Sequence, residues 1–188
     1  MGMAGLRLAA SAWLVLIVFA ARDGAAYTWV TYNGHEYTRS DYQGPWLNIE
    51  AEAVAAGGHL VSINDDAENS WLMTTFKNER TPLGHPIVWI GYYYDASVND
   101  WKWISGEPVT YAREDYLHWP QGGTHAYLHL PDHFLQPGTW NANPYHDSTG
   151  SEAPFGIIER VPEPSCAGAV SLAFVTLLRR RPRINKGT

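Results

Sequence analysis

The side chains best suited to bind a ligand combine flat aromatic rings with uncharged hydrogen-bonding groups. A polyol suits that combination, because its C–H faces stack on rings while its hydroxyl groups need neutral or ionic partners. A protein ligand would suit it equally, since Trp and Tyr are also common interface anchors. The candidate ligand-binding residues are His118, Trp119, Gln121, Asn141, Asn143 and Tyr145.

Histidine is concentrated in the same part of the chain, where five of the eight histidines lie between residues 118 and 146. His125 and His129 would share one face of a strand, and with Asp132 and Asp147 nearby a Zn²⁺ site is chemically possible. Strand neighbours of this parity stand too far apart to share one metal ion unaided. We therefore interpret these side chains as hydrogen-bonded surface imidazoles, with zinc as the alternative.

Charge and cysteine content exclude several functions. Residues 27–160 hold 6 Lys and Arg against 17 Asp and Glu, a net charge of −11. An acidic domain with no basic stripe is a poor partner for nucleic acid or anionic lipid. The only cysteine, Cys166, lies outside this span, so the domain has no disulfide. No Ser-His-Asp arrangement, carboxylate pair or nucleotide-binding loop stands out, so we predict no catalytic residues.

Turn and periodicity signals indicate the elements that must position these residues. Asn33-Gly34, between aromatic-rich runs, predicts a hairpin. Pro45 opens a helix with an apolar stripe, and Gly57 is placed to end it. Glu50 and Glu52 fall off that stripe, so we expect both in solvent.

An acidic run at residues 64–68, Asn-Asp-Asp-Ala-Glu, opens a second helix. Carboxylates in a first turn suit the helix dipole and can form a capping box. Binding of a cation is the alternative, but capping explains these residue types without a metal. Strands interrupted by two early helices, without βαβ alternation, indicate the α+β class.

Three short segments occur in an order that resembles the C-type lectin-like domain family. They are "GGHLVSI" at 57–63, "AEN" at 67–69 and "WIG" at 89–91. The resemblance implies an α+β fold of two helices and mostly antiparallel strands with a long loop, here at 111–123. Animal members carry paired cysteines, so this version is disulfide-free. The implied role is a non-catalytic, lectin-like carbohydrate-binding module, and a protein-binding adhesin on the same fold is the alternative.

The resemblance also implies where a calcium-dependent sugar site would lie. Sugar-binding members carry Glu-Pro-Asn or Gln-Pro-Asp in the long loop and Trp-Asn-Asp on a later strand, whose oxygens bind Ca²⁺. Here the loop position falls near His-Trp-Pro at 118–120, and the later segment reads Trp-Asn-Ala at 140–142. We therefore expect no Ca²⁺ cofactor, with either calcium-independent binding or a degenerate calcium site, and a bound Ca²⁺ is the alternative. The resemblance assigns Trp140 to the core.

Both ends of the chain are predicted to be sorting segments. Residues 1–26 combine a positive start, an apolar core and small residues, which is typical of a secretory signal peptide. Residues 161–188 resemble the PEP-CTERM tail of Gram-negative bacteria, which implies export, transient inner-membrane anchoring and processing by an exosortase. A generic C-terminal anchor is the alternative. We expect the domain, residues 27–160, at the cell surface or outside the cell, associated with polysaccharide. The sorting residues are Val161, Pro162, Glu163, Pro164, Arg179, Arg180 and Arg181.

Overall fold

The computed structural model describes residues 27–114, 123–134, 136–147 and 152–162. Within these residues it contains two α-helices, a short 3-10 helix and eight strands. The helices are α1 (Trp46–Ala55), α2 (Asp66–Thr75) and η1 (Pro144–His146). The strands are β1 (Val30–Tyr32), β2 (His35–Arg39), β3 (His59–Leu60), β4 (Ile87–Asp95), β5 (Asp100–Trp103), β6 (His125–His129), β7 (Trp140–Ala142) and β8 (Phe155–Arg160).

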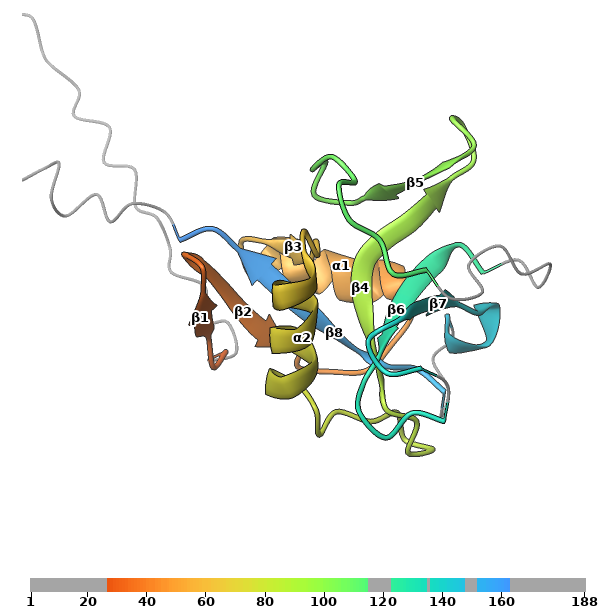
Figure 1. Cartoon of the computed structure of the whole chain (residues 1–188), viewed down its shortest axis with the longest axis horizontal. Coiled ribbons are helices and arrows are strands. Elements are labelled where there is room, and N and C mark those ends of the chain that lie inside the picture. The colour runs from red at the N-terminus through yellow and green to blue at the C-terminus, as the bar shows by residue number, and fades with distance from the viewer. Residues whose placement is uncertain (1–26, 115–122, 135, 148–151, 163–188) are drawn as a thin grey trace, which may run out of the picture.

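The strands form one sheet in the order β1-β2-β8-β4-β6-β7, with β3 added beside β8 and β5 beside β4 (Figure 1). Every pairing is antiparallel except that of β4 with β8. The prediction of an α+β fold with two helices and mostly antiparallel strands is therefore confirmed. The middle of the predicted long loop, residues 115–122, lies outside the described residues.

Strand β4 divides the core into two layers, because its successive side chains point to opposite faces of the sheet. Val88 and Ile90 pack in the cluster that includes Leu72 of α2. Ile87 and Trp89 pack in the cluster that includes residues of α1. The sheet is thus covered by a different helix on each side. Four tryptophans, Trp46, Trp89, Trp103 and Trp140, are almost fully buried in these layers.

The local turn signals are confirmed. Asn33 and Gly34 both have positive φ, 48° and 86°, as a tight hairpin turn between β1 and β2 requires. Gly57 follows α1 with φ 86°, and Gly58 N donates to Ala53 O at 3.0 Å. This arrangement satisfies carbonyl groups at the helix end.

The start of α2 shows capping by the acidic run. Asp65 is the N-cap, and its carboxylate accepts the Glu68 backbone N–H at 2.7 Å. Glu68 in turn accepts the Asn64 backbone N–H at 2.8 Å. These bonds account for Asp65 and Glu68, as the capping interpretation predicts.

The expectation for Glu50 was wrong. This side chain is only 8% exposed. Its carboxylate accepts the Leu60 backbone N–H at 2.9 Å and lies 2.7 Å from His59 Nδ1. Glu50 therefore ties α1 to β3, a contact that helical periodicity alone does not reveal because the partner comes from the next element.

No helix among the described residues is both long and apolar enough to cross a membrane. Residues 1–26 and 163–188, which hold the predicted signal peptide and most of the predicted sorting tail, lie outside the described part of the chain. Val161 and Pro162 follow directly after β8, and Val161 is exposed.

Candidate functional site

Strand β7 and the short helix η1 that follows it carry half of the predicted ligand-binding residues. Asn141 lies opposite Tyr127 in the ladder, on the face of the sheet that α1 covers. Asn143 is the N-cap of η1, and Tyr145 is in that helix. All three line one pocket of about 290 Å³, here called the β7 pocket. Its lining residues are His85, Tyr127, His133, Phe134, Asn141, Asn143, Tyr145, His146 and Glu152.

The other three predicted residues, His118, Trp119 and Gln121, lie outside the described residues. Their participation in the site stays a prediction.

The two asparagines are fixed by backbone contacts that leave their amide groups in a defined orientation. Asn141 Oδ1 accepts the Ala142 N–H at 2.7 Å, and Asn143 Oδ1 accepts the Tyr145 N–H at 3.0 Å. Each amide oxygen is therefore engaged, whereas neither amide nitrogen donates to a residue in the described ranges. Two N–H₂ donors are thus available to an uncharged ligand.

Two exposed aromatic side chains belong to the pocket lining. Phe134 is 86% exposed and stacks on the His133 ring with a centroid distance of 4.6 Å. Tyr145 is 72% exposed. Rings of this kind offer flat apolar faces to the C–H groups of a sugar, and they are equally suited to a protein surface.

Six further lining residues were not predicted as ligand-binding: His85, Tyr127, His133, Phe134, His146 and Glu152. His133 and His146 belong to the histidine-rich region but were interpreted as surface imidazoles. His85 lies far from Asn141 in the chain, and Glu152 lies in the segment between η1 and β8. Neither residue carries a sequence signal that connects it with Asn141. Only the folded sheet brings them together.

The interpretation of all these histidines as surface groups was wrong for two of them. His129 is fully buried, and His146 is 8% exposed. His129 stacks on His133 at 3.9 Å, and its Nδ1 lies 3.1 Å from Thr139 Oγ1. Its Nε2 is buried with no partner among the described residues. Strand β6 lies inside the sheet between β4 and β7, which explains this burial.

Burial and mutual repulsion keep the imidazole rings of His129, His133 and His146 uncharged at neutral pH. Burial, together with the nearby His133, lowers the pKa of His129 to about 3. Burial also lowers the pKa of His133, assisted by His85 and His146. The pKa of His146 is lowered by burial, although Glu152 opposes that shift. Each neutral ring has one donor and one acceptor nitrogen.

The donor atoms on β7 do not fit the calcium site that the family pattern would place there. The oxygen of Asn141 is already occupied by a backbone N–H, and Ala142 supplies no side-chain oxygen. Among the described residues, no group of three or more His, Cys, Asp or Glu could hold a metal ion. His125 instead pairs with Asp147 at 2.8 Å and stacks on Trp46 at 4.4 Å, in surroundings different from those of His129.

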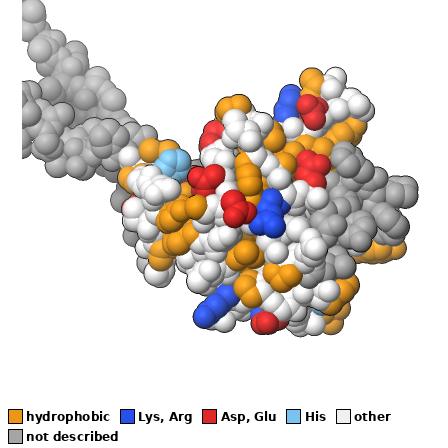
Figure 2. Space-filling model, viewed as in Figure 1, with side chains coloured by type: hydrophobic (Ala, Val, Ile, Leu, Met, Phe, Trp, Pro, Cys, Tyr) orange, Lys and Arg blue, Asp and Glu red, His pale blue; other side chains and the backbone are white. Residues whose placement is uncertain are grey.

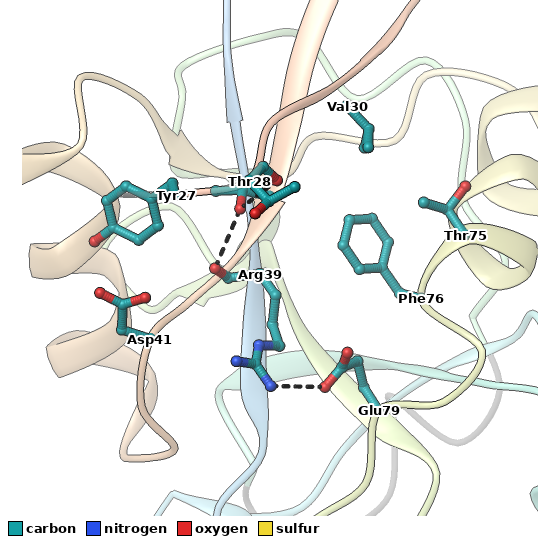
Figure 3. Close-up of a pocket in the computed structure, with 9 residues that line it drawn as sticks. Tyr27, Thr28, Val30, Arg39, Asp41, Thr75, Phe76 and Glu79 are labelled. Carbon is teal, nitrogen blue, oxygen red and sulfur yellow. Dashed lines mark hydrogen bonds and ion pairs between the residues drawn. The ribbon is translucent and has the colours of Figure 1, made fainter. Parts of the chain in front are cut away.

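A second pocket, of about 390 Å³, lies between β2 and the end of α2 and contains none of the predicted residues (Figure 3). Arg39 forms an ion pair with Glu79 at 3.3 Å across it. The Arg39 guanidinium also lies 4.0 Å from the centroid of the Phe155 ring. Arg39, the cationic residue of this second pocket, is therefore already paired with other groups of the protein.

Charged groups are dispersed over one face of the molecule. On the face drawn in Figure 2, acidic and basic side chains lie next to one another and form no basic stripe. Two such pairs are Arg113 with Asp66 at 2.7 Å and Lys102 with Asp95 at 2.8 Å. The described part of the face drawn in Figure 2 therefore offers no polyanion-binding track.

The sheet, its two helices and a pocket of rings and amides define a ligand-binding domain of the α+β class. The family profile described as "Lectin C-type domain" matches residues 42–144, more than half of the chain. The chain therefore belongs to the C-type lectin domain family, whose members are binding proteins and not enzymes.

Sequence relatives agree with this membership. The chain is similar to mouse C-type lectin domain family 4 member F, at 30% identity over 88 residues, which cover 47% of this chain and 15% of that protein. It is also similar to the hepatic lectin of Gallus gallus, at 25% identity over 132 residues, which cover 65% of this chain and 59% of the relative. The chain thus corresponds to only part of the length of these relatives.

Solved structures show the same fold. The carbohydrate-recognition domain of mouse scavenger receptor C-type lectin superposes with a TM-score of 0.55 at 22% identity, covering 72% of this chain and 94% of that domain. A calcium-independent type II antifreeze protein superposes with a TM-score of 0.52 at 19% identity, covering 71% of this chain and 91% of that protein chain. At these identities the likeness concerns the fold alone.

Proposed function

We propose that this chain is an exported, non-catalytic carbohydrate-binding module whose ligand binds in the β7 pocket. The observation that carries the proposal is the meeting of Asn141, Asn143 and Tyr145 around one cavity. Amide donors and an exposed ring are what a sugar unit needs for its hydroxyl groups and its apolar face. The predicted loop residues His118, Trp119 and Gln121 would complete the site.

We further propose that binding does not require Ca²⁺. The occupied oxygen of Asn141 and the methyl group of Ala142 support this view, because they remove two of the ligands a calcium ion would need. A relative of the same fold is described as calcium-independent, so the fold tolerates the loss of calcium.

The location of the protein belongs to the same proposal. Residues 1–26 would direct export, and residues 161–188 would anchor the protein briefly in the inner membrane until an exosortase processes it. Replacing Arg179, Arg180 and Arg181 by Ser should impair retention in the membrane fraction. Unchanged fractionation of the variant would contradict the role of the tail.

The binding proposal is tested with a glycan array probed with residues 27–162, once with Ca²⁺ and once with a chelator. We expect equal binding in both arms. Tyr145→Ala and Asn141→Ala should each weaken binding by about tenfold, the effect of losing one stacking or hydrogen-bonding contact of roughly 1–1.5 kcal/mol. Tyr42→Ala removes another exposed tyrosine that does not line the pocket, so it serves as the matched control.

Loss of binding in chelator would contradict calcium independence. Absence of glycan binding both with Ca²⁺ and with chelator would favour the second candidate function, a protein-binding adhesin. That alternative has its own support, because a ring as exposed as Phe134 is also typical of protein interfaces.

A further inference from the structure

The wall of the β7 pocket is unusually rich in imidazole. His85, His133 and His146 come from three different segments and all line the cavity. The rings of His85 and His146 lie perpendicular with centroids 6.2 Å apart. His133 is backed by the stacked ring of His129. Protonation of any of these rings therefore places a positive charge at or beside the ligand.

One carboxylate faces these rings. Glu152 Oε2 lies 2.9 Å from His85 Nδ1 and 3.6 Å from His146 Nδ1. The other titratable groups in the lining are the phenols of Tyr127 and Tyr145, and burial raises the pKa of Tyr127. Nearby charges are already paired: Asp132 with Arg80, and Asp147 with His125.

The charge of the described pocket lining therefore becomes more positive as the pH falls. The rings of His133 and His146 carry no charge at neutral pH. When these two rings are protonated, they add two positive charges to a pocket whose described lining contains one carboxylate. The lowered pKa of His133 and of His146 places this change on the acid side of neutrality.

We propose that the β7 pocket binds uncharged sugars at neutral pH and carboxylate-bearing sugars, such as uronates, at acid pH. This inference rests on the proposed function and names its ligand classes. A neutral imidazole both donates and accepts hydrogen bonds, as sugar hydroxyl groups do. An imidazolium only donates, and it pairs best with an anionic oxygen. At neutral pH neither His133 nor His146 offers a uronate a positive charge, and the domain as a whole is acidic.

The test is a glycan array that carries neutral oligosaccharides and counterparts oxidised to the carboxylate at C6, probed with the full chain at pH 7.5 and pH 5.0. We expect neutral glycans to bind at least about fivefold more weakly at pH 5.0, and uronates to bind about tenfold more tightly. Near-ultraviolet circular dichroism at both values verifies that the domain stays folded.

A double variant, His85→Gln with His133→Gln, separates the pocket from the general loss of negative charge on acidification. Both side chains are partly exposed, so the variant should fold. We expect the pH response of its binding to be at most about half that of the native chain, because His133 is removed while His146 remains. The control is His59→Gln, which removes a histidine that is also paired with a glutamate but lies outside the pocket.

Two results would overturn the inference while leaving the proposed function intact. One is neutral-sugar binding of equal strength at both pH values with no gain for uronates. The other is a pH response that is as large in the double variant as in the native chain. Absence of binding to either class at either pH would overturn the proposed function itself, and the inference with it.

Discussion

His129 is a histidine held uncharged inside the core. Its ring is fully buried, stacked on His133 and hydrogen-bonded at Nδ1 to Thr139. Its pKa lies well below the value of an exposed imidazole, at about 3. The folded protein therefore binds a proton at this site less readily than the unfolded chain does. Acidification must favour unfolding.

We predict that the free energy of unfolding falls by about 2 kcal/mol through His129 between pH 6.5 and pH 5. The unfolded imidazole takes up its proton near pH 6.5, and each further pH unit costs about 1.4 kcal/mol until the folded pKa is reached. The contribution is complete above pH 6.5 and is lost as the pH falls towards 3. Urea unfolding at several pH values measures it.

His129→Asn provides the control for this prediction, because the amide can still bond Thr139 but does not titrate. The variant should lose less stability on acidification than the native protein. If the free energy of unfolding falls equally with pH in the variant and the native protein, other groups cause the acid sensitivity.

At the residue scale, the sequence predicted some of the residues that line the β7 pocket but not all of them. Amides and rings at 141–145 could be recognised because they lie close together in sequence. His85 and Glu152 could not, since their partners are set by tertiary structure. The burial of His129 was also missed, because a strand pattern does not reveal that β6 lies inside the sheet.

Among the elements, the close approach of β3 to β4 depends on a single glycine. Gly91 N donates to Val61 O at 2.8 Å. A Cβ at position 91 would lie 2.4 Å from the backbone oxygen of Leu60 and 3.1 Å from a methyl carbon of Ile104. The glycine of the "WIG" segment is thus explained by the lack of room for a side chain.

We predict that Gly91→Ala destabilises the domain by at least about 2 kcal/mol, because a rigid backbone segment must move to admit the methyl group. Gly44→Ala is the matched control, since the atoms nearest to its added Cβ lie at 3.5 Å or beyond. Urea unfolding of both variants measures the difference. Equal stability of the two would show that β3 can shift without cost.

The elements were the most predictable level of the fold. The hairpin turn, the glycine end of α1 and the cap of α2 all depend on a few neighbouring residues, which the sequence displays directly. Glu50 shows the limit of this reasoning. Its solvent-facing position in the helical pattern is covered by β3, and that contact depends on the tertiary fold.

In the molecule as a whole, the last strand completes the sheet. Strand β8 pairs with β2, β3 and β4, so it joins the N-terminal hairpin to the rest of the sheet. Its buried Glu159 accepts the Ser62 N–H at 2.9 Å, and the Tyr37 hydroxyl donates to it at 3.3 Å. Removing β8 would expose both core layers.

We therefore predict that a chain of residues 27–154 does not fold, whereas residues 27–162 do. The shorter chain lacks the strand that carries Ile157 and Ile158, both fully buried. Circular dichroism and protease resistance compare the two. A protease-resistant shorter chain would show that the sheet forms without its last strand.

The pairing of β2 with β8 has a consequence for the order of events during synthesis. Glu36 and Arg160, which are joined by a hydrogen bond, lie 124 residues apart along the chain. A ribosome must release nearly the entire domain before this contact can form, and such distant pairing also slows folding. The nascent domain therefore stays open until translation of its last strand, which is the state that a translocation channel for unfolded chains accepts.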